Sequence, residues 1–125
     1  MLLDRLRGHQ LLPNDLREQL PPLYSQEALG LQAQAILKLF TPRGGFTWYA
    51  SEGSPVDADG YYDTDKAKVD FLFFGLVAGL EIELGYFALS ELDIATDETS
   101  LPIVERDLHF KRETLAVLMA KHQRQ

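Results

Sequence analysis

The feature that most constrains the fold is the apolar stretch DFLFFGLVAGLEIELGYFALSEL, residues 70–92, which contains no lysine or arginine. Glu81 and Glu83 interrupt this stretch before it reaches the roughly 20 apolar residues of a membrane-spanning helix. Residues 71–78 are apolar at odd and even positions alike, which predicts a strand in the middle of a sheet, covered on both faces. Gly75 would allow another backbone or an aromatic ring to approach this strand closely.

Two hairpins are predicted around this strand. A turn at Gly79 would return the chain along residues 84–89 as the antiparallel neighbour. Upstream, apolar residues occupy every odd position from 29 to 39, and this period of two indicates a strand at about residues 34–41. Turn residues follow in PRGG, and the aromatic and β-branched residues of FTWYASEG predict the returning strand. Trp48 and Tyr49 should point to opposite faces of the sheet.

Short helices are predicted beside these strands. Asn14 is the predicted N-cap of a helix over about residues 15–20, which the following two prolines would end. Ser25 would open one further helical turn, and Ser90 would start a short helix after the second hairpin. An amphipathic C-terminal helix is predicted by residues at helical spacing, namely Leu115, Leu118, Met119 and His122.

Alternation resumes in IVERDLHFK, residues 103–111, where Arg106 would share one side of a strand with three apolar residues. A buried guanidinium requires a carboxylate partner, because an unpaired buried charge is very costly. A structural ion pair, an exposed strand edge or a site for an anionic ligand would each accommodate Arg106. The available carboxylate partners are Glu52, Asp70, Glu81, Glu83 and Glu91.

Together these elements predict a small α+β domain, in which an antiparallel sheet of four or five strands is accompanied by short helices, including the amphipathic C-terminal helix. The domain would span residues 11–125, and residues 1–10 would form an N-terminal extension. Charged residues interrupt the leucines of this extension, so we expect no signal peptide. We therefore expect a cytoplasmic protein that does not enter a membrane.

The net charge of −7 is concentrated in the middle of the chain, because residues 52–107 contain 14 acidic and only 3 basic residues. Nucleic-acid phosphates are bound by clustered lysine and arginine, so we expect no direct contact with nucleic acid. Three explanations for the acidity remain. It can be a solvated surface, a docking surface for a protein with a basic surface, or an imitation of DNA.

No strong catalytic motif is present, and we expect no cofactor. The chain lacks cysteine, which excludes disulfides, zinc thiolate sites and cysteine nucleophiles. The segment DADG, residues 57–60, matches part of a calcium-binding loop, but Pro55 and Lys66 occupy the first and twelfth ligand positions, so we expect no metal site. Glu81 and Glu83 are the candidates for a two-carboxylate hydrolase, although in a turn they would usually meet solvent.

Four motifs occur in order along the chain: TWY with the following EG (residues 47–53), FFG with GLE and ELGYF (73–87), SEL (90–92) and ERDL (105–108). Together they resemble the bacterial family described as domain of unknown function 2958, over about residues 11–111. The resemblance implies a small cytoplasmic accessory protein, often encoded on mobile elements, and brings no activity, substrate or cofactor. The acidic loop at residues 55–69 is longer than in the family pattern, and His109 replaces a more typical aromatic residue.

Three functions are consistent with these observations. The favoured one is a non-enzymatic binding or adaptor protein whose aromatic and acidic surface meets another protein with a basic surface. The alternatives are a DNA-mimicking inhibitor of a nuclease or restriction enzyme, and a carboxylate-based or metal-dependent hydrolase. No catalytic residue is assigned. The candidate binding residues are Trp48, Tyr49, Glu52, Glu81, Glu83, Tyr86 and Arg106.

Overall fold

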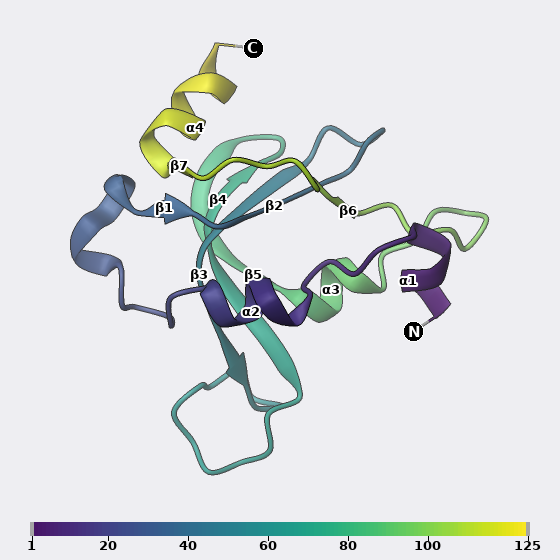
Figure 1. The fold of residues 1–125 in the computed structure, drawn as a ribbon. Helices are drawn as coiled ribbons and strands as arrows, with labels where there is room; N and C mark the ends of the chain where they lie inside the picture. The colour runs from purple at the N-terminus through teal and green to yellow at the C-terminus, as the bar shows by residue number, and fades with distance from the viewer. Residues whose placement is uncertain (1, 125) are drawn as a thin grey trace.

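The computed structural model describes residues 2–124 and confirms the predicted α+β fold. Five antiparallel strands form a twisted sheet in the order β5-β4-β3-β2-β6, and β1 pairs separately with β7 (Figure 1). The strands are β1 (Gln34–Ala35), β2 (Leu37–Phe40), β3 (Thr47–Val56), β4 (Asp70–Ala78), β5 (Ile82–Ala88), β6 (Glu105–Arg106) and β7 (Glu113–Thr114). The helices are α1 (Leu2–Arg7), α2 (Asn14–Gln19), the 3₁₀ helix η1 (Glu27–Gln32), α3 (Leu89–Asp93) and α4 (Leu115–Gln123).

The apolar stretch at residues 70–92 forms the predicted β4–β5 hairpin and ends in α3. β4 is paired on both sides, but the central strand of the five is β3. β3 also continues to Val56 instead of ending at Gly53 as predicted. β2 pairs only with residues 47–50, so the rest of β3 is paired on one side only, by β4. Pro55 has no backbone N–H to donate, and on the unpaired side of the strand none is needed.

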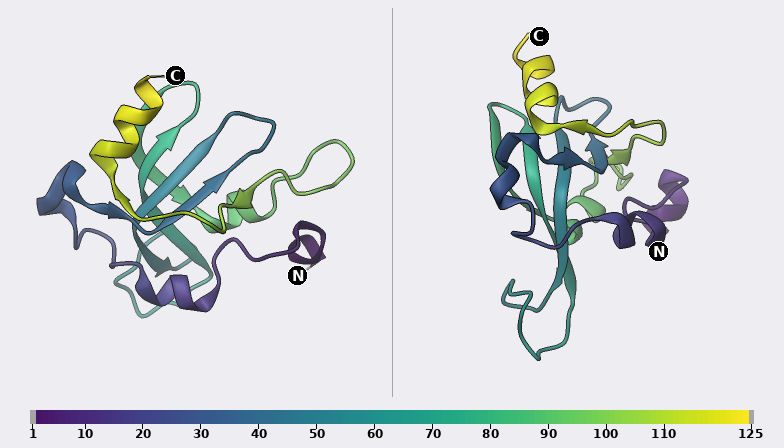
Figure 2. Two further views of the ribbon diagram at one scale, coloured as in Figure 1. Left: turned by 45° about the horizontal axis from the view of Figure 1, so that its top comes forward. Right: turned by 60° about the vertical axis from the view of Figure 1, so that its left-hand side comes forward.

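One face of the sheet carries a core of phenylalanine rings. The Phe73 ring lies between those of Phe71 and Phe87, with centroid distances of 5.1 and 5.2 Å, and the Phe73 side chain has no exposed surface. The segment that contains α2 packs over this face together with α3 (Figure 2). This phenylalanine face is therefore the main hydrophobic core of the domain.

The opposite face is covered by the C-terminal helix, as its amphipathic pattern predicted. Leu115 and Leu118 of α4 are buried against Tyr49 and Leu76 of the sheet. Trp48 packs instead against the phenylalanine core, which confirms that Trp48 and Tyr49 point to opposite faces. η1 lies beside α4 on the Tyr49 side of the sheet (Figure 2).

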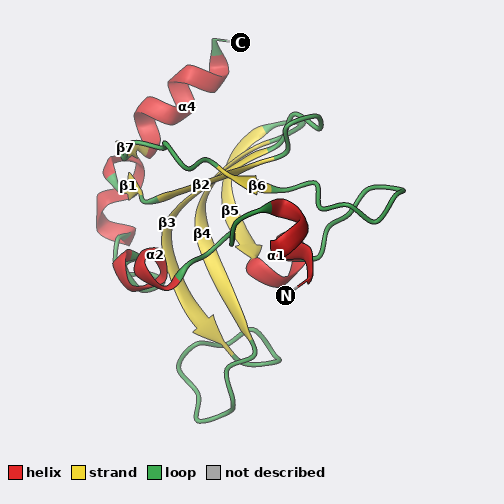
Figure 3. Cartoon of the chain, turned by 45° about the vertical axis from the view of Figure 1, so that its right-hand side comes forward, coloured by secondary structure: helices red, strands yellow, loops and turns green. Residues whose placement is uncertain are grey.

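Two helices begin one residue earlier than predicted. Asn14 is the first residue of α2, and Pro13 occupies the N-cap position, so the prediction of an asparagine cap is wrong. α3 begins at Leu89, and the Ser90 hydroxyl donates to an oxygen of Asp70 at 2.5 Å instead of capping the helix. The helices are short and surround the sheet (Figure 3). None of those within residues 2–124 has the length and apolar composition needed to cross a bilayer.

The strand predicted over residues 103–111 is mostly wrong. Only Glu105 and Arg106 pair with β2, because the chain turns at Asp107, whose carboxylate accepts the backbone N–H of His109. Leu108 is consequently exposed instead of sharing a buried side with Arg106. The strand predicted over residues 34–41 is likewise divided into β1 and β2, which belong to different sheets.

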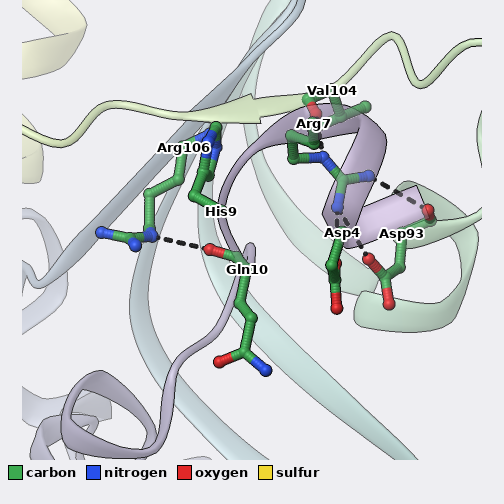
Figure 4. A network of polar contacts seen from close by, with 7 residues as sticks. All are labelled: Asp4, Arg7, His9, Gln10, Asp93, Val104 and Arg106. Atoms are coloured by element: carbon green, nitrogen blue, oxygen red, sulfur yellow. Dashed lines mark hydrogen bonds and ion pairs between the residues drawn. The ribbon is translucent and has the colours of Figure 1, made fainter. Parts of the chain in front are cut away.

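Residues 2–10 pack on the rest of the domain through Arg7, whose side chain has no exposed surface. The Arg7 guanidinium donates to the backbone carbonyl oxygens of Val104 at 2.7 Å and Asp93 at 3.1 Å (Figure 4). It also forms ion pairs with the carboxylates of Asp4 and Asp93. A buried arginine with this many partners avoids the penalty of an uncompensated charge, so it ties α1 to α3 and to the segment before β6.

Candidate functional site

A β-bulge in β3 determines which of its side chains point to the face of the sheet opposite the phenylalanine core. Ser51 is the extra residue, because the pairing between β3 and β4 shifts between Ala50 and Glu52. Without the bulge, Glu52 would pair one position further along β4 and point toward the phenylalanine core. With it, Glu52 pairs with Phe74, which pairs in turn with Tyr86. The three side chains therefore form one row across β3, β4 and β5.

A groove of about 270 Å³ opens above this row, between the sheet and the segment that leads into η1. We call it the Tyr24–Tyr86 groove, after the residues at its rims. Its lining combines aromatic rings, small residues and two carboxylates, and includes no lysine, arginine or histidine. The lining residues are Tyr24, Gln26, Glu27, Gly30, Ala33, Ser51, Glu52, Phe74, Leu84 and Tyr86.

Glu52 holds one wall of the groove in place. Its two carboxylate oxygens accept the backbone N–H groups of Tyr24 at 2.9 Å and of Gln26 at 2.7 Å, although Glu52 is only 3% exposed. These bonds fix Tyr24 in a left-handed conformation with φ of 70°, which costs a non-glycine residue of order 1 kcal/mol. The buried carboxylate thus sets the position of the Tyr24 ring.

Replacing Glu52 with glutamine tests this anchor. A glutamine side chain offers one acceptor oxygen where the structure uses two, so an N–H group of Tyr24 or Gln26 would face an NH₂ group instead. We expect Glu52→Gln to lower the free energy of unfolding by about 2 kcal/mol, measured by urea denaturation. Glu83→Gln, an exposed glutamate of β5, is the matched control and should stay within about 0.5 kcal/mol of the parent. Equal effects of the two changes would contradict an anchoring role.

Four aromatic rings meet at the rim of the groove. The Tyr24 ring centroid lies 6.3 Å from that of Tyr86 and 5.6 Å from that of Tyr62, and Tyr86 lies 5.0 Å from Phe74. Tyr24 and Tyr86 are about half exposed, at 48% and 50%. The neighbouring Tyr24 side chain raises the pKa of Tyr86 to about 12, helped by partial burial and by the carboxylates of Glu52 and Glu27. The Tyr86 hydroxyl therefore stays neutral, and both carboxylates lie near it.

The groove carries negative charge without a compensating base. No ion pair within residues 2–124 involves Glu52 or Glu27, since the five ion pairs of this part of the chain use other carboxylates. Glu27 is exposed at the start of η1, whereas Glu52 lies at the floor. An ionised carboxylate buried without a positive partner is unfavourable, so a cation in the groove would relieve this cost.

The structure brings together two of the predicted binding residues, Glu52 and Tyr86. Trp48 lies on the opposite face, where its ring stacks on Phe46 at 5.8 Å. Glu81 and Glu83 are exposed near the β4–β5 turn and do not line the groove. These three residues therefore do not form one surface with Glu52 and Tyr86.

Arg106 does not meet any of the carboxylates predicted as its partners. Its guanidinium donates from Nε to the backbone carbonyl oxygen of Gln10 at 2.9 Å, and its backbone N–H donates to His9 (Figure 4). Burial lowers the pKa of Arg106. The contacts of Arg106 thus lie on the N-terminal segment, away from the groove, and support the structural interpretation of this residue.

Tyr49 is buried beneath α4, where its hydroxyl lies 2.7 Å from Nε2 of His122. Burial, followed by the carboxylates of Glu113 and Asp107, raises the pKa of Tyr49 to about 12. Burial also lowers the pKa of His122 below its ordinary value of 6.5. A neutral imidazole can accept a hydrogen bond from the Tyr49 hydroxyl, so this pair joins α4 to the sheet and is not open to a partner.

The lowered pKa of His122 makes stability depend on pH. Above about 6.5 the imidazole is neutral in both the folded and the unfolded chain. Below that value the unfolded chain takes up the proton first, so stability should fall until the pH passes the lower folded pKa. We expect His122→Gln to flatten the fall in urea midpoint between pH 7 and pH 5, whereas His109→Gln, an exposed histidine, should leave it unchanged. An equally steep profile in both variants would contradict this assignment.

Two carboxylates of the acidic loop at residues 57–69, those of Asp57 and Asp59, have their partners within the loop. Asp57 accepts the backbone N–H groups of Asp59 and Tyr61 and the hydroxyl of Thr64, and these bonds lower its pKa. Asp59 pairs with Lys66. Within residues 2–124, no three potential ligand residues cluster closely enough to hold a metal ion.

The sequence did not predict the other residues of the groove, among them Tyr24, Glu27 and Phe74. The two-sided apolar pattern predicts the strand that contains Phe74 but not the role of its side chain, although the alternation along the strand places Phe74 and Phe73 on opposite faces. Tyr24 and Glu27 reach the groove only because the segment after Pro22 folds back onto Glu52, a contact 26 to 28 residues distant along the chain. No local pattern encodes that contact.

Comparisons with known proteins give one finding. No curated protein and no solved structure matches the chain significantly. A family model described as "Protein of unknown function (DUF2958)" matches residues 11–125, a range that includes every residue of the Tyr24–Tyr86 groove.

Proposed function

Since the chain belongs to the DUF2958 family, whose description carries no activity, we propose from its geometry that it is a non-enzymatic protein-binding domain of the cytoplasm. The binding site in this proposal is the Tyr24–Tyr86 groove, and the partner presents a basic segment to it. The encoding of such proteins on mobile elements, which the resemblance implies, would make the partner a protein of the bacterial host or of the element itself.

The observation that carries this proposal is the pair of half-exposed tyrosines beside a buried carboxylate. Tyrosine is enriched among the residues that dominate binding energy at protein interfaces, because its rigid ring offers a large apolar area and a polar end. Tyr24 and Tyr86 are held in place by neighbouring rings and by the Glu52 anchor, so little side-chain entropy remains to be lost on binding.

The geometry favours binding over hydrolysis. A two-carboxylate hydrolase needs one carboxylic acid that keeps its proton. In the groove, both oxygens of Glu52 are engaged as acceptors of backbone N–H groups, and Glu27 is exposed to solvent. Neither carboxylate is therefore arranged as a proton donor, and both lie beside aromatic rings, where they are suited to holding a cation.

The arrangement of the acidic residues also disfavours DNA mimicry, which needs carboxylates at phosphate-like spacing along one exposed face. Glu81 precedes β5 and Glu83 is its second residue, whereas Asp93 ends α3 and Asp97 follows that helix. Asp93 is in addition paired with Arg7. These four carboxylates therefore do not form one continuous acidic array.

Site-specific photo-crosslinking tests the proposal. A benzoylphenylalanine at Leu84, inside the groove, should capture a protein of discrete mass in the cells that encode this chain, whereas the same group at Ile94, an exposed residue after α3, should not. Tyr86→Ala should reduce the Leu84 adduct strongly, and Tyr61→Ala, which removes an exposed ring outside the groove lining, should not. An adduct that is insensitive to Tyr86→Ala would refute the groove as the binding site.

A further inference from the structure

We propose that the Tyr24–Tyr86 groove receives the guanidinium group of an arginine side chain. This inference rests on the proposed function, because the arginine would belong to the basic segment of the protein partner. It goes further in naming the chemical group that the groove recognises.

Charge complementarity is the first argument. Glu52 is buried at the floor of the groove and is neutralised by no cation of the chain within residues 2–124. An ionised carboxylate has about four acceptor positions, and the backbone N–H groups of Tyr24 and Gln26 occupy only two. Glu27 adds a second carboxylate at the open side. A positively charged occupant would fill free acceptor positions of both carboxylates and balance their charge.

The aromatic rings are the second argument. Tyr24, Phe74 and Tyr86 line the same cavity, and neighbouring centroids lie 5.0 and 6.3 Å apart with interplanar angles of 60° and 55°. Because all three rings line the cavity, an occupant would contact an aromatic surface. A cation within about 6 Å of a ring centroid is attracted by the negative face of the ring, and the attraction strengthens where water is excluded.

The third argument distinguishes arginine from lysine. A guanidinium group is planar, so it can stack on a tyrosine ring while its five N–H donors reach carboxylates at its edge. An ammonium group is a compact and strongly hydrated charge that does not combine these contacts. The cavity of about 270 Å³ lies just below the range of pockets for drug-sized ligands, which starts at about 300 Å³, so a single side chain suits it.

Capped amino acids provide the probe. N-acetyl-arginine methylamide would be titrated against the full chain with ¹³C-labelled tyrosine, and the ring resonances of Tyr24 and Tyr86 followed by NMR. We expect saturable shifts with a dissociation constant in the millimolar range. The matched neutral isostere, N-acetyl-citrulline methylamide, should produce no saturable shift. N-acetyl-lysine methylamide should bind at least about 3-fold more weakly.

Variants locate the contact. Glu27→Gln removes one exposed charge without breaking any hydrogen bond of the side chain, and it should weaken arginine binding about 5-fold, in line with the loss of one charge-assisted contact. Tyr86→Leu should abolish the shift of Tyr24. Tyr61→Leu is the control, since Tyr61 is exposed and lies outside the groove lining, and it should leave the affinity unchanged.

The outcomes separate this inference from the proposed function. Equal binding of arginine and citrulline, or an affinity that Glu27→Gln does not change, would overturn the inference. Tighter binding of lysine would overturn the choice of a guanidinium. In either case a crosslinked partner that depends on Tyr86 would still support the groove as a protein-binding site, whereas loss of that crosslink alone would remove the proposed function.

Discussion

Replacement of Gly75 by alanine should destabilise the protein by about 3 kcal/mol, at the upper end of the cost of overpacking. A Cβ atom at this position would lie 1.7 Å from the carbonyl oxygen of Tyr49 and 2.8 Å from its carbonyl carbon. These are backbone atoms of β3 beside the Ser51 bulge, so no side-chain rotation can make room. β3 and β4 would have to separate, and urea denaturation should detect the change as a lower midpoint.

The chain contains its own control for this substitution. Gly85 pairs directly with Gly75 across β4 and β5, but a Cβ atom built on Gly85 would meet no atom within 4 Å. Gly85→Ala should therefore change the free energy of unfolding by no more than about 0.5 kcal/mol. If the two alanine variants were equally stable, close approach of the β3 backbone would not explain the glycine at position 75.

Phe73→Ala should lower the free energy of unfolding by about 3 to 5 kcal/mol. The Phe73 ring is fully buried between Phe71 and Phe87, so its removal leaves a cavity in the main core in addition to the lost burial of the ring. The cavity lies on the face opposite the Tyr24–Tyr86 groove. Unfolding monitored by tryptophan fluorescence would measure the effect, because Trp48 packs against the same core.

Two comparisons sharpen the test at Phe73. Phe73→Leu refills much of the volume and should cost clearly less than alanine. Tyr61→Ala removes an aromatic ring that is 62% exposed, and it should have little effect. A loss of less than about 1 kcal/mol in Phe73→Ala would indicate that this face of the sheet is not a close-packed core.

The sequence predicted the sheet well where neighbouring residues along the chain were enough to determine the local structure. Apolar residues on both sides of residues 71–78 predicted an interior strand, and Gly75 predicted the close approach that Tyr49 makes. The alternation of Trp48 and Tyr49 predicted their opposite faces. The first and the third of these inferences depended on the period of two in an extended chain, and the second on the missing side chain of glycine.

The groove could not be predicted in the same way, because it depends on departures from that period. The extra residue Ser51 shifts the register, and the left-handed Tyr24 turns the preceding segment toward the sheet. The carboxylate partners predicted for Arg106 were wrong for a related reason. The strand that was expected to carry it ends at once, and its guanidinium meets a backbone carbonyl of the N-terminal segment. Long-range contacts of single residues determine all three features.

The contacts of Asp57 at the start of the 57–69 loop separate the rim of the groove from the sheet. Asp57 ties the loop to itself through Asp59, Tyr61 and Thr64, so the ends of β3 and β4 do not depend on the residues beyond these contacts. The same loop contributes Tyr62 to the rim, where its ring meets Tyr24. Insertions and deletions in this loop can therefore change the rim of the groove while the sheet stays intact. In the proposed function, the specificity of the groove would therefore be set at a rim that can change independently of the core.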